Sequence, residues 1–166
     1  LGTLMRAHDW AASRLGPPSS WPQALQTLAG LMLRSNAPVF LAWGPDLCML
    51  YNDACIDIFK QKHPAALGQP LCAVWSEVRA DIEPLVNRTL AGESISLENA
   101  CFILRCDAKD EQASFGFSYA PVDGPDGQVA GLYCTLSKTT AGVVANNQQQ
   151  AQTRWLYSLF EQAPSF

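Results

Sequence analysis

The stretch that decides the fold is VFLAWGPDLCMLYNDACIDIF, residues 39–59. Its first five residues form an apolar run that ends in a Gly-Pro-Asp turn, and a second apolar run follows over residues 47–51. Two short apolar runs joined by a tight turn predict an antiparallel hairpin. Asn52 and Asp53 come next, and their side chains can accept hydrogen bonds from the free N–H groups of a first helical turn. We therefore expect Asn52 to cap a short helix after the hairpin.

The segment after this helix, KHPAALGQPL (residues 62–71), contains two prolines and a glycine, so we expect only short helical turns there. Helical spacing returns over residues 72–90. The apolar residues of this second segment that share one helical face are Val74, Val78, Ile82 and Leu85. Pro84 predicts a kink or a new first turn within it.

Three strand-like runs follow, over residues 95–104, 113–122 and 129–136. In the middle run Phe115, Phe117 and Tyr119 alternate and therefore point to one face. The polar segment RCDAKDE is expected to be the turn before this run. DGPDGQ is expected to be the hairpin turn after it, with both glycines available for positive φ. The order of two strands, several helices and three strands predicts an α+β fold.

The two ends of the chain differ from this middle part. The pattern predicts a helix over residues 3–15 and an amphipathic helix to about Leu33, with Ser19 or Ser20 as its cap and Pro22 in its first turn. From Thr139 onward the sequence is polar and glutamine-rich, and apolar residues return at helical spacing near the end. We expect an N-terminal helical attachment over 1–37, a core over 38–138, and a C-terminal linker helix with further sequence over 139–166.

Composition limits the function classes. The chain has 166 residues, of which 48% are apolar and 16% charged, which suits one domain with a proper core. A net charge of −4 and the lack of any basic run disfavour a nucleic-acid partner. No apolar stretch approaches the ~20 residues that cross a bilayer, and no signal peptide is apparent. We expect a cytoplasmic protein and, since the sequence begins at Leu1 and stops at Phe166, a segment of a longer chain.

The six cysteines are scattered through apolar runs without a C-x-x-C pair. Zinc sites usually show paired ligands at short spacing, and only Cys101 and Cys106 approach such a spacing. We expect reduced, mostly buried thiols and no metal site.

Catalytic motifs are also missing from the sequence. His8 and His63 are the only histidines, and neither accompanies a nucleophile motif such as G-x-S-x-G. No P-loop and no G-x-G-x-x-G occurs. Asp81 and Glu83 lie two positions apart on a predicted helix and so do not face each other. We expect no catalytic residue in this chain.

The order of elements and several segments resemble the PAS domain family. The first two strands of the family, with the Asn that opens the next helix, resemble FLAWGPDLCMLYNDA. Its middle helices resemble HPAALGQPLCAVWSEV, and its closing hairpin with the segment that leaves the domain resembles FGFSYAPVDGPDGQVAGLYCTLSKTT. RAHDW, LGPPSSWPQAL, FLAWGPDL and HPAALG are similar to the N-terminal PAS module of bacterial multi-domain sensor histidine kinases. The resemblance covers about residues 4–140. Residues 97–115 depart from it, where an acidic, glycine-containing hairpin is typical.

The resemblance implies a five-stranded antiparallel sheet in the order 2-1-5-4-3 with short helices on one face. It implies a sensory and regulatory role in two-component signal transduction, with relay through flanking helices to a downstream kinase. It also implies a homodimer formed through those helices, and LYSLFEQAPSF resembles the start of a second PAS module. The kinase parts themselves do not occur in this sequence. The alternative from another class is a ligand-free dimerisation and scaffold module.

A ligand pocket is expected between the sheet and the helices, since such pockets are mostly apolar with a few polar groups. The aromatic residues that we expect to line it are Trp43, Tyr51, Phe59, Trp75, Phe117, Tyr119 and Tyr133. The alternative is that these rings only fill the core. The buried tyrosines favour a pocket because a buried hydroxyl needs a partner.

The cofactor, if there is one, is not named by the sequence. Flavin-binding PAS modules carry the stretch Asn-Cys-Arg-Phe-Leu, and here the corresponding segment reads ALGQPLCAVW, with Cys72 as its nearest thiol. Haem-binding PAS modules place an axial histidine on the long middle helix, and residues 76–91 contain none. His63 would serve only if its loop turned inward. Haem binding is therefore a third alternative.

Overall fold

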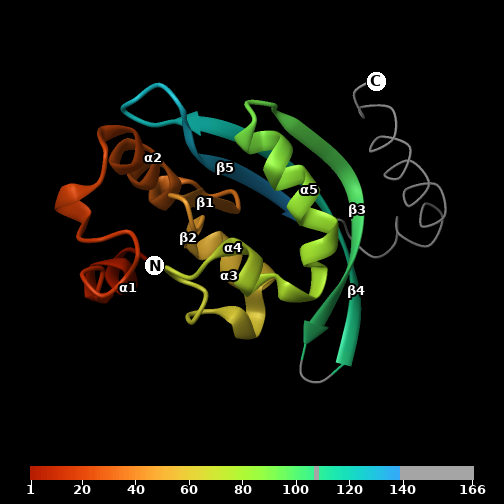
Figure 1. The fold of residues 1–166 in the computed structure, drawn as a ribbon. Helices are drawn as coiled ribbons and strands as arrows, with labels where there is room; N and C mark the ends of the chain where they lie inside the picture. The colour runs from red at the N-terminus through yellow and green to blue at the C-terminus, as the bar shows by residue number, and fades with distance from the viewer. Residues whose placement is uncertain (107–108, 139–166) are drawn as a thin grey trace, which may run out of the picture.

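The computed structural model describes residues 1–106 and 109–138, and within 102–113 and at residue 138 it describes the backbone alone. Five strands form a single antiparallel sheet in the order β2-β1-β5-β4-β3 (Figure 1). They are β1 (Val39–Trp43), β2 (Cys48–Tyr51), β3 (Ile95–Cys106), β4 (Lys109–Asp123) and β5 (Val129–Lys138). Both the predicted fold class and the predicted strand order are confirmed.

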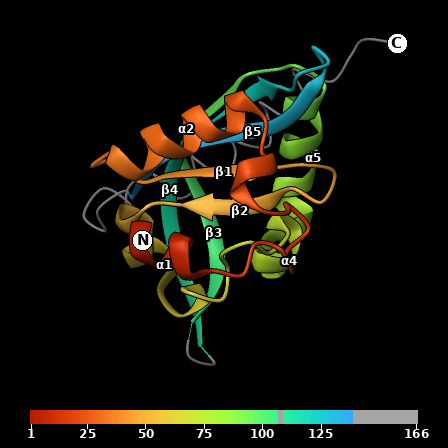
Figure 2. The same ribbon diagram turned by 90° about the vertical axis from the view of Figure 1, so that its left-hand side faces the viewer.

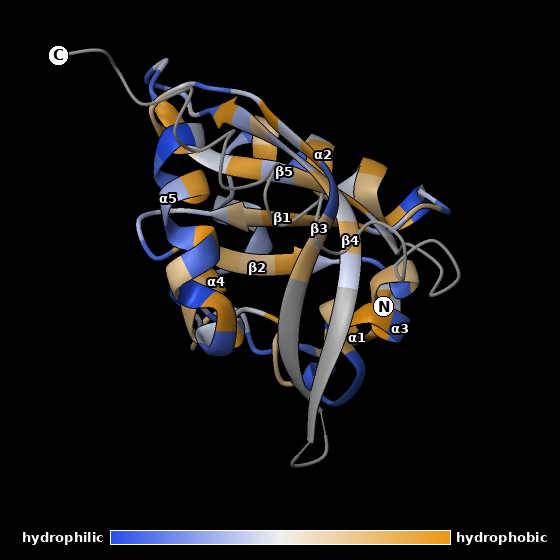
Figure 3. Ribbon diagram, turned by 90° about the vertical axis from the view of Figure 1, so that its right-hand side faces the viewer, coloured by the Kyte–Doolittle hydropathy of each residue, from blue (hydrophilic) through white to orange (hydrophobic). Residues whose placement is uncertain are grey.

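Short helices cover what we call the inner face of the sheet, the face to which Phe40, Phe117 and Tyr119 point. Phe40 and Tyr119 both pair with Cys134 in the register, and so they share this face. The helices over it are η2 (Asp53–Cys55), α3 (Ile56–Phe59), η3 (Lys60–Lys62), α4 (Leu71–Val74), η4 (Ser76–Val78) and α5 (Arg79–Leu90). Hydrophilic and hydrophobic segments alternate along the α5 ribbon, as expected for a helix with one side in the core (Figure 3).

The opposite, outer face of the sheet is covered in part by α2 (Gln23–Arg34), which lies across β1 (Figure 2). Leu25, Ala29 and Met32 of α2 are buried, so the predicted amphipathic helix is confirmed. Its predicted cap is wrong. Pro22 occupies the position before the helix, and no side chain caps it, because Ser20 lies in η1 (Pro18–Ser20) and donates to Pro17 O.

The predicted helix over residues 3–15 is also wrong in length, since α1 spans only Gly2–Ala7. The chain turns after it so that Trp10 can be buried, with its indole nitrogen donating to Met5 O at 2.6 Å. Trp10 packs edge-on against Trp21, with ring centroids 5.1 Å apart. Both tryptophans belong to the same hydrophobic core as the strands. The division at residue 37 stays a prediction, and the part predicted for 139–166 lies outside the described residues.

The free edge of β2 is closed by the segment that follows η3. Gly68 N donates to Met49 O at 2.8 Å, Met49 N to Gln69 O at 2.9 Å, and Leu71 N to Leu47 O at 2.9 Å. The proline- and glycine-rich break predicted here is therefore a backbone partner for the edge strand, which removes an open pairing surface.

Three further expectations need correction. β3 ends at Cys106 and β4 begins at Lys109, so most of the segment RCDAKDE, which was expected to be a turn, is strand. In the DGPDGQ turn only Gly127 has a positive φ, of 77°. Of the two outcomes expected at Pro84, a new first turn is wrong because Pro84 lies inside α5, and a kink stays a prediction. No helix in the part of the chain that the structure describes is both long and apolar enough to span a bilayer.

Candidate functional site

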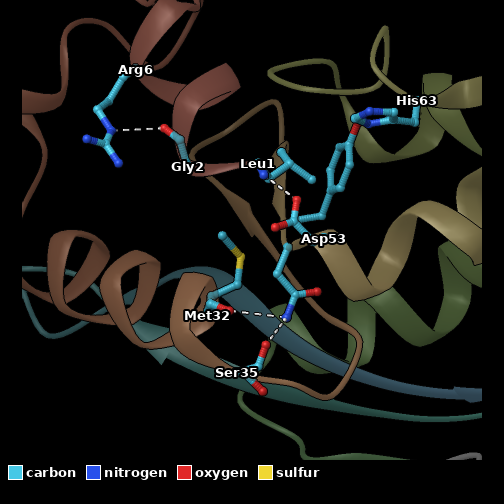
Figure 4. A network of polar contacts seen from close by, with 9 residues as sticks. Leu1, Gly2, Arg6, Met32, Ser35, Asp53 and His63 are labelled. Carbon is cyan, nitrogen blue, oxygen red and sulfur yellow. Dashed lines mark hydrogen bonds and ion pairs between the residues drawn. The ribbon is translucent and has the colours of Figure 1, made fainter.

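The side chain of Asn52 joins three elements instead of capping a helix. Helix η2 starts after it with no side-chain cap, so the predicted cap is wrong. The Asn52 Oδ1 atom accepts a hydrogen bond from Val39 N, and Nδ2 lies 2.7 Å from Ala37 O. Nδ2 also lies 3.1 Å from Met32 O and 3.2 Å from Ser35 O (Figure 4). Because Nδ2 has two hydrogens, the three carbonyls share them. Asn52 thus fixes the end of α2 to β1 and to the first helix over the inner face.

A cavity of about 50 Å³ lies between the inner face and the helices. The sheet contributes Phe40, Phe115, Phe117, Tyr119 and Leu136. The helical segment contributes Ile58, Trp75, Val78 and Ile82. Only two of the nine residues carry a polar side-chain atom, Tyr119 with its hydroxyl and Trp75 with its indole N–H.

These two polar groups have no hydrogen-bond partner among the described residues. Tyr119 is 4% exposed. Burial raises the pKa of Tyr119 well above its usual value, and the nearby Cys134 thiol acts in the same direction. The hydroxyl therefore stays protonated at physiological pH and is available as a donor. Because no described residue accepts from this hydroxyl, the cavity is chemically suited to a molecule that brings an acceptor.

A series of rings connects the cavity to His63. Phe59 packs edge-on against Trp75 with centroids 5.2 Å apart and lies 4.5 Å from the Tyr51 ring. The Tyr51 hydroxyl is 3.0 Å from His63 Nδ1 (Figure 4), and burial raises the pKa of Tyr51 to about 12. His63 is thus held by Tyr51 and does not line the cavity.

The structure brings only some of the seven predicted pocket residues together. Trp75, Phe117 and Tyr119 line the cavity, and Tyr51 and Phe59 lie in the core beside it. Trp43 and Tyr133 do not line it, because the register pairs Leu41 with Tyr133 and Trp43 with Gly131 and so places both side chains on the outer face. A ligand contact at any of the seven stays a prediction.

Sequence reasoning left six of the lining residues out of its pocket set. They are Phe40, Ile58, Val78, Ile82, Phe115 and Leu136. A signal existed for three of them, since Phe115 alternates with Phe117 and since Val78 and Ile82 were assigned to one helical face. The predicted set held aromatic residues alone, which excluded the four aliphatic ones, and it also missed the aromatic Phe40 and Phe115.

The described cysteines are Cys48, Cys55, Cys72, Cys101 and Cys134, and none of them forms a disulfide. Burial raises the pKa of Cys55 to about 12 and that of Cys134 well above its usual value, so both are inert thiols at neutral pH. Over the described side chains, no group of three His, Cys, Asp or Glu residues is placed to hold a metal ion.

Lys62 holds one wall of the cavity in place. Its Nζ donates to Val74 O at 2.8 Å, lies 2.8 Å from Glu77 Oε1, and sits 5.0 Å from the centroid of the Trp75 ring. The Glu77 side chain is only 11% exposed. A single cation therefore fixes η3 to residues 74–77, which include the Trp75 wall.

Replacing Lys62 by methionine is expected to lower the free energy of unfolding by about 2 kcal/mol, because it leaves a mostly buried carboxylate without its partner. Amides of residues 71–78 should exchange with solvent faster than in the unmodified chain. Hydrogen exchange read by mass spectrometry and urea unfolding measure both effects. The matched control is Arg79→Met, which breaks the exposed Arg79–Glu83 pair and should cost no more than about 0.5 kcal/mol. Equal effects of the two variants would contradict the role of Lys62.

Comparisons with known proteins agree with this fold. A family model described as PAS fold matches residues 34–143. The PAS domain of Bordetella pertussis BvgS is similar with a TM-score of 0.53 at 19% identity, covering 84% of this chain and 98% of that one. The Rhodobacter sphaeroides LOV protein is similar with a TM-score of 0.51 at 15% sequence identity, and the match covers 81% of each chain. The PAS domain of the fruit-fly ELK potassium channel is similar with a TM-score of 0.53 at 13% sequence identity, and the match covers 70% of this chain and 97% of that one.

At these identities the likeness to solved structures concerns the fold alone. A comparison with functionally curated proteins gave no match.

Proposed function

The chain belongs to the PAS fold family, and on that premise we propose that it is the sensory module of a bacterial histidine kinase in a two-component system. A small molecule in the cavity changes the packing of the module, and the flanking segments relay this change to a downstream kinase. The function is regulatory and the kinase chemistry belongs to other parts of the full-length protein. We place that protein's module in the cytoplasm.

The observation that carries this proposal is the position of the cavity between both flanking connections. Leu136 lines it from β5, two residues before that strand ends. On the other side, Asn52 joins the end of α2 to the segment that leads into the cavity-lining α3. A ligand that repacks the cavity wall therefore acts on elements to which both ends of the module are attached.

The second candidate function is a ligand-free dimerisation module, and Leu31 favours it. With Leu4 and Leu33, Leu31 makes up the exposed large apolar side chains of the described residues, and all three lie on α1 and α2, where a second copy could cover them. A homodimer through the flanking helices is compatible with both candidates. The exit helix and the second PAS module proposed for residues 139–166 would extend that contact.

Native mass spectrometry of the purified chain separates the two candidates. We expect a dimer that carries a small molecule, and we expect Ile82→Phe to lose this extra mass by filling the cavity from α5 while the far-UV circular dichroism stays unchanged. The control is Asn87→Phe, which adds the same ring at an exposed position of α5. A dimer that is empty before any substitution supports the scaffold function, and an empty monomer contradicts both.

The relay is tested in the full-length protein. Ile82→Phe is expected to change the rate of histidine autophosphorylation by several-fold, while Asn87→Phe leaves it unchanged. Loss of the ligand with no change of rate would contradict the relay, because the cavity would then be uncoupled from the kinase.

A further inference from the structure

The cavity wall offers no charge to a ligand. Its nine residues are apolar or aromatic, and none carries an ionised group. Transfer of an unpaired ion into such surroundings costs several kcal/mol, so a carboxylate, a phosphate or an ammonium group would bind there only with a counter-charge that the wall lacks.

The polar groups of the wall are hydrogen-bond donors. The indole N–H of Trp75 can only donate. The phenol of Tyr119 can donate or accept, and its hydrogen has no acceptor among the described residues, so a ligand acceptor is the one group that both wall residues can serve. A ligand that presents an acceptor atom to the Tyr119 hydroxyl gains a hydrogen bond that none of the described residues offers it. Tyr119, with 4% of its surface exposed against 9% for Trp75, is the more deeply buried of the two.

The size of the cavity sets a further limit. A cavity needs ~10–15 Å³ of free volume for each water molecule that it holds, so the volume of about 50 Å³ corresponds to roughly three to five waters. The cavity as it stands therefore suits a molecule of only a few non-hydrogen atoms. Tricyclic and tetrapyrrole rings are much larger than this.

From these three observations we infer that the cavity selects a small, uncharged, mostly apolar molecule with a hydrogen-bond acceptor, and that Tyr119 is the residue that selects it. The inference rests on the proposed function, in which this cavity is the ligand site. It goes further by naming the chemical class of the ligand and the group that recognises it.

Four probes of six non-hydrogen atoms each test the inference: cyclopentanone, methylenecyclopentane, cyclopropanecarboxylate and cyclopentylammonium. The ketone and the alkene differ only in the acceptor oxygen. We expect the dialysed chain to bind cyclopentanone about tenfold more tightly than methylenecyclopentane, and to bind neither charged probe, in ligand-observed NMR titrations. Tyr119→Phe removes one oxygen atom from the wall and should bring the ratio close to one. The matched control is Tyr133→Phe on the outer face, which should leave the ratio unchanged.

The outcomes are distinguishable. Equal binding of the ketone and the alkene by the unmodified chain, or a ratio that Tyr119→Phe does not change, overturns the assignment to Tyr119 and leaves the proposed ligand site intact. Tight binding of a charged probe that Ile82→Phe abolishes overturns the chemical class. Binding of none of the four probes overturns the inference together with the cavity's role as a ligand site.

Discussion

Asn52→Ala is expected to lower the free energy of unfolding by about 4 kcal/mol, which is one of the two largest effects of a single substitution predicted for this chain. Asn52 is 1% exposed, and its side chain satisfies one backbone N–H and three backbone carbonyls. Each buried polar group left without a partner costs about 1–3 kcal/mol, and the missing amide leaves a void. Urea unfolding followed by circular dichroism measures the change.

Two further variants make this prediction specific. Asn36→Ala changes an exposed asparagine of the same connection and should stay within about 0.5 kcal/mol of the unmodified chain. Asn52→Asp should destabilise at least as much as alanine, since a carboxylate would face three carbonyl oxygens. A helix cap would behave differently, because aspartate is as good a cap as asparagine. Tolerance of Asn52→Asp would therefore restore the capping role and contradict the arrangement described above.

Gly131→Ala is expected to cost more than about 3 kcal/mol and to leave little folded protein. A Cβ atom at this position of β5 would lie 2.4 Å from Ala42 O and 2.8 Å from Trp43 Cε3. The first of these contacts is with the backbone of β1, so the two central strands would have to separate. Overpacking of this kind costs about 1–3 kcal/mol even where only side chains must move.

Gly30→Ala is the control, and it should change stability in the opposite direction. A Cβ at Gly30 would meet nothing within 4 Å, and alanine is favoured over glycine inside a helix by about 1 kcal/mol. The melting temperatures of the two variants, measured by calorimetry, should lie on opposite sides of that of the unmodified chain. If Gly131→Ala lowered the melting temperature only slightly, by an amount similar to the change at Gly30, then β1 and β5 would separate easily.

The elements of the fold were largely predictable from local sequence. The alternation of Phe115, Phe117 and Tyr119 predicted a shared face, and the structure buries all three on the inner face. Asn52 shows the limit of such reasoning. Its position before a helix suggests a cap, but the partners that determine its role come from residues 32–39, which tertiary folding brings to it.

The candidate site was less predictable than the fold. Trp43 and Tyr133 are aromatic and flank the correct strands, yet the strand register, which no local pattern reveals, turns them to the outer face. The prediction of the length of α1 was wrong for a related reason. Helical spacing over residues 3–15 was overridden by the gain from burying Trp10, a long-range packing term that propensity does not contain.

The shared core of the N-terminal segment and the sheet has a consequence for protein engineering. The family match begins at residue 34, whereas Trp10, Trp21, Leu25 and Met32 are already built into the interior. A fusion protein that begins at residue 34 would keep the sheet and lose the apolar side chains of α2 that cover its outer face. The unit that can be transferred intact from this chain therefore begins at or before Met5, well ahead of the segment that the family model matches.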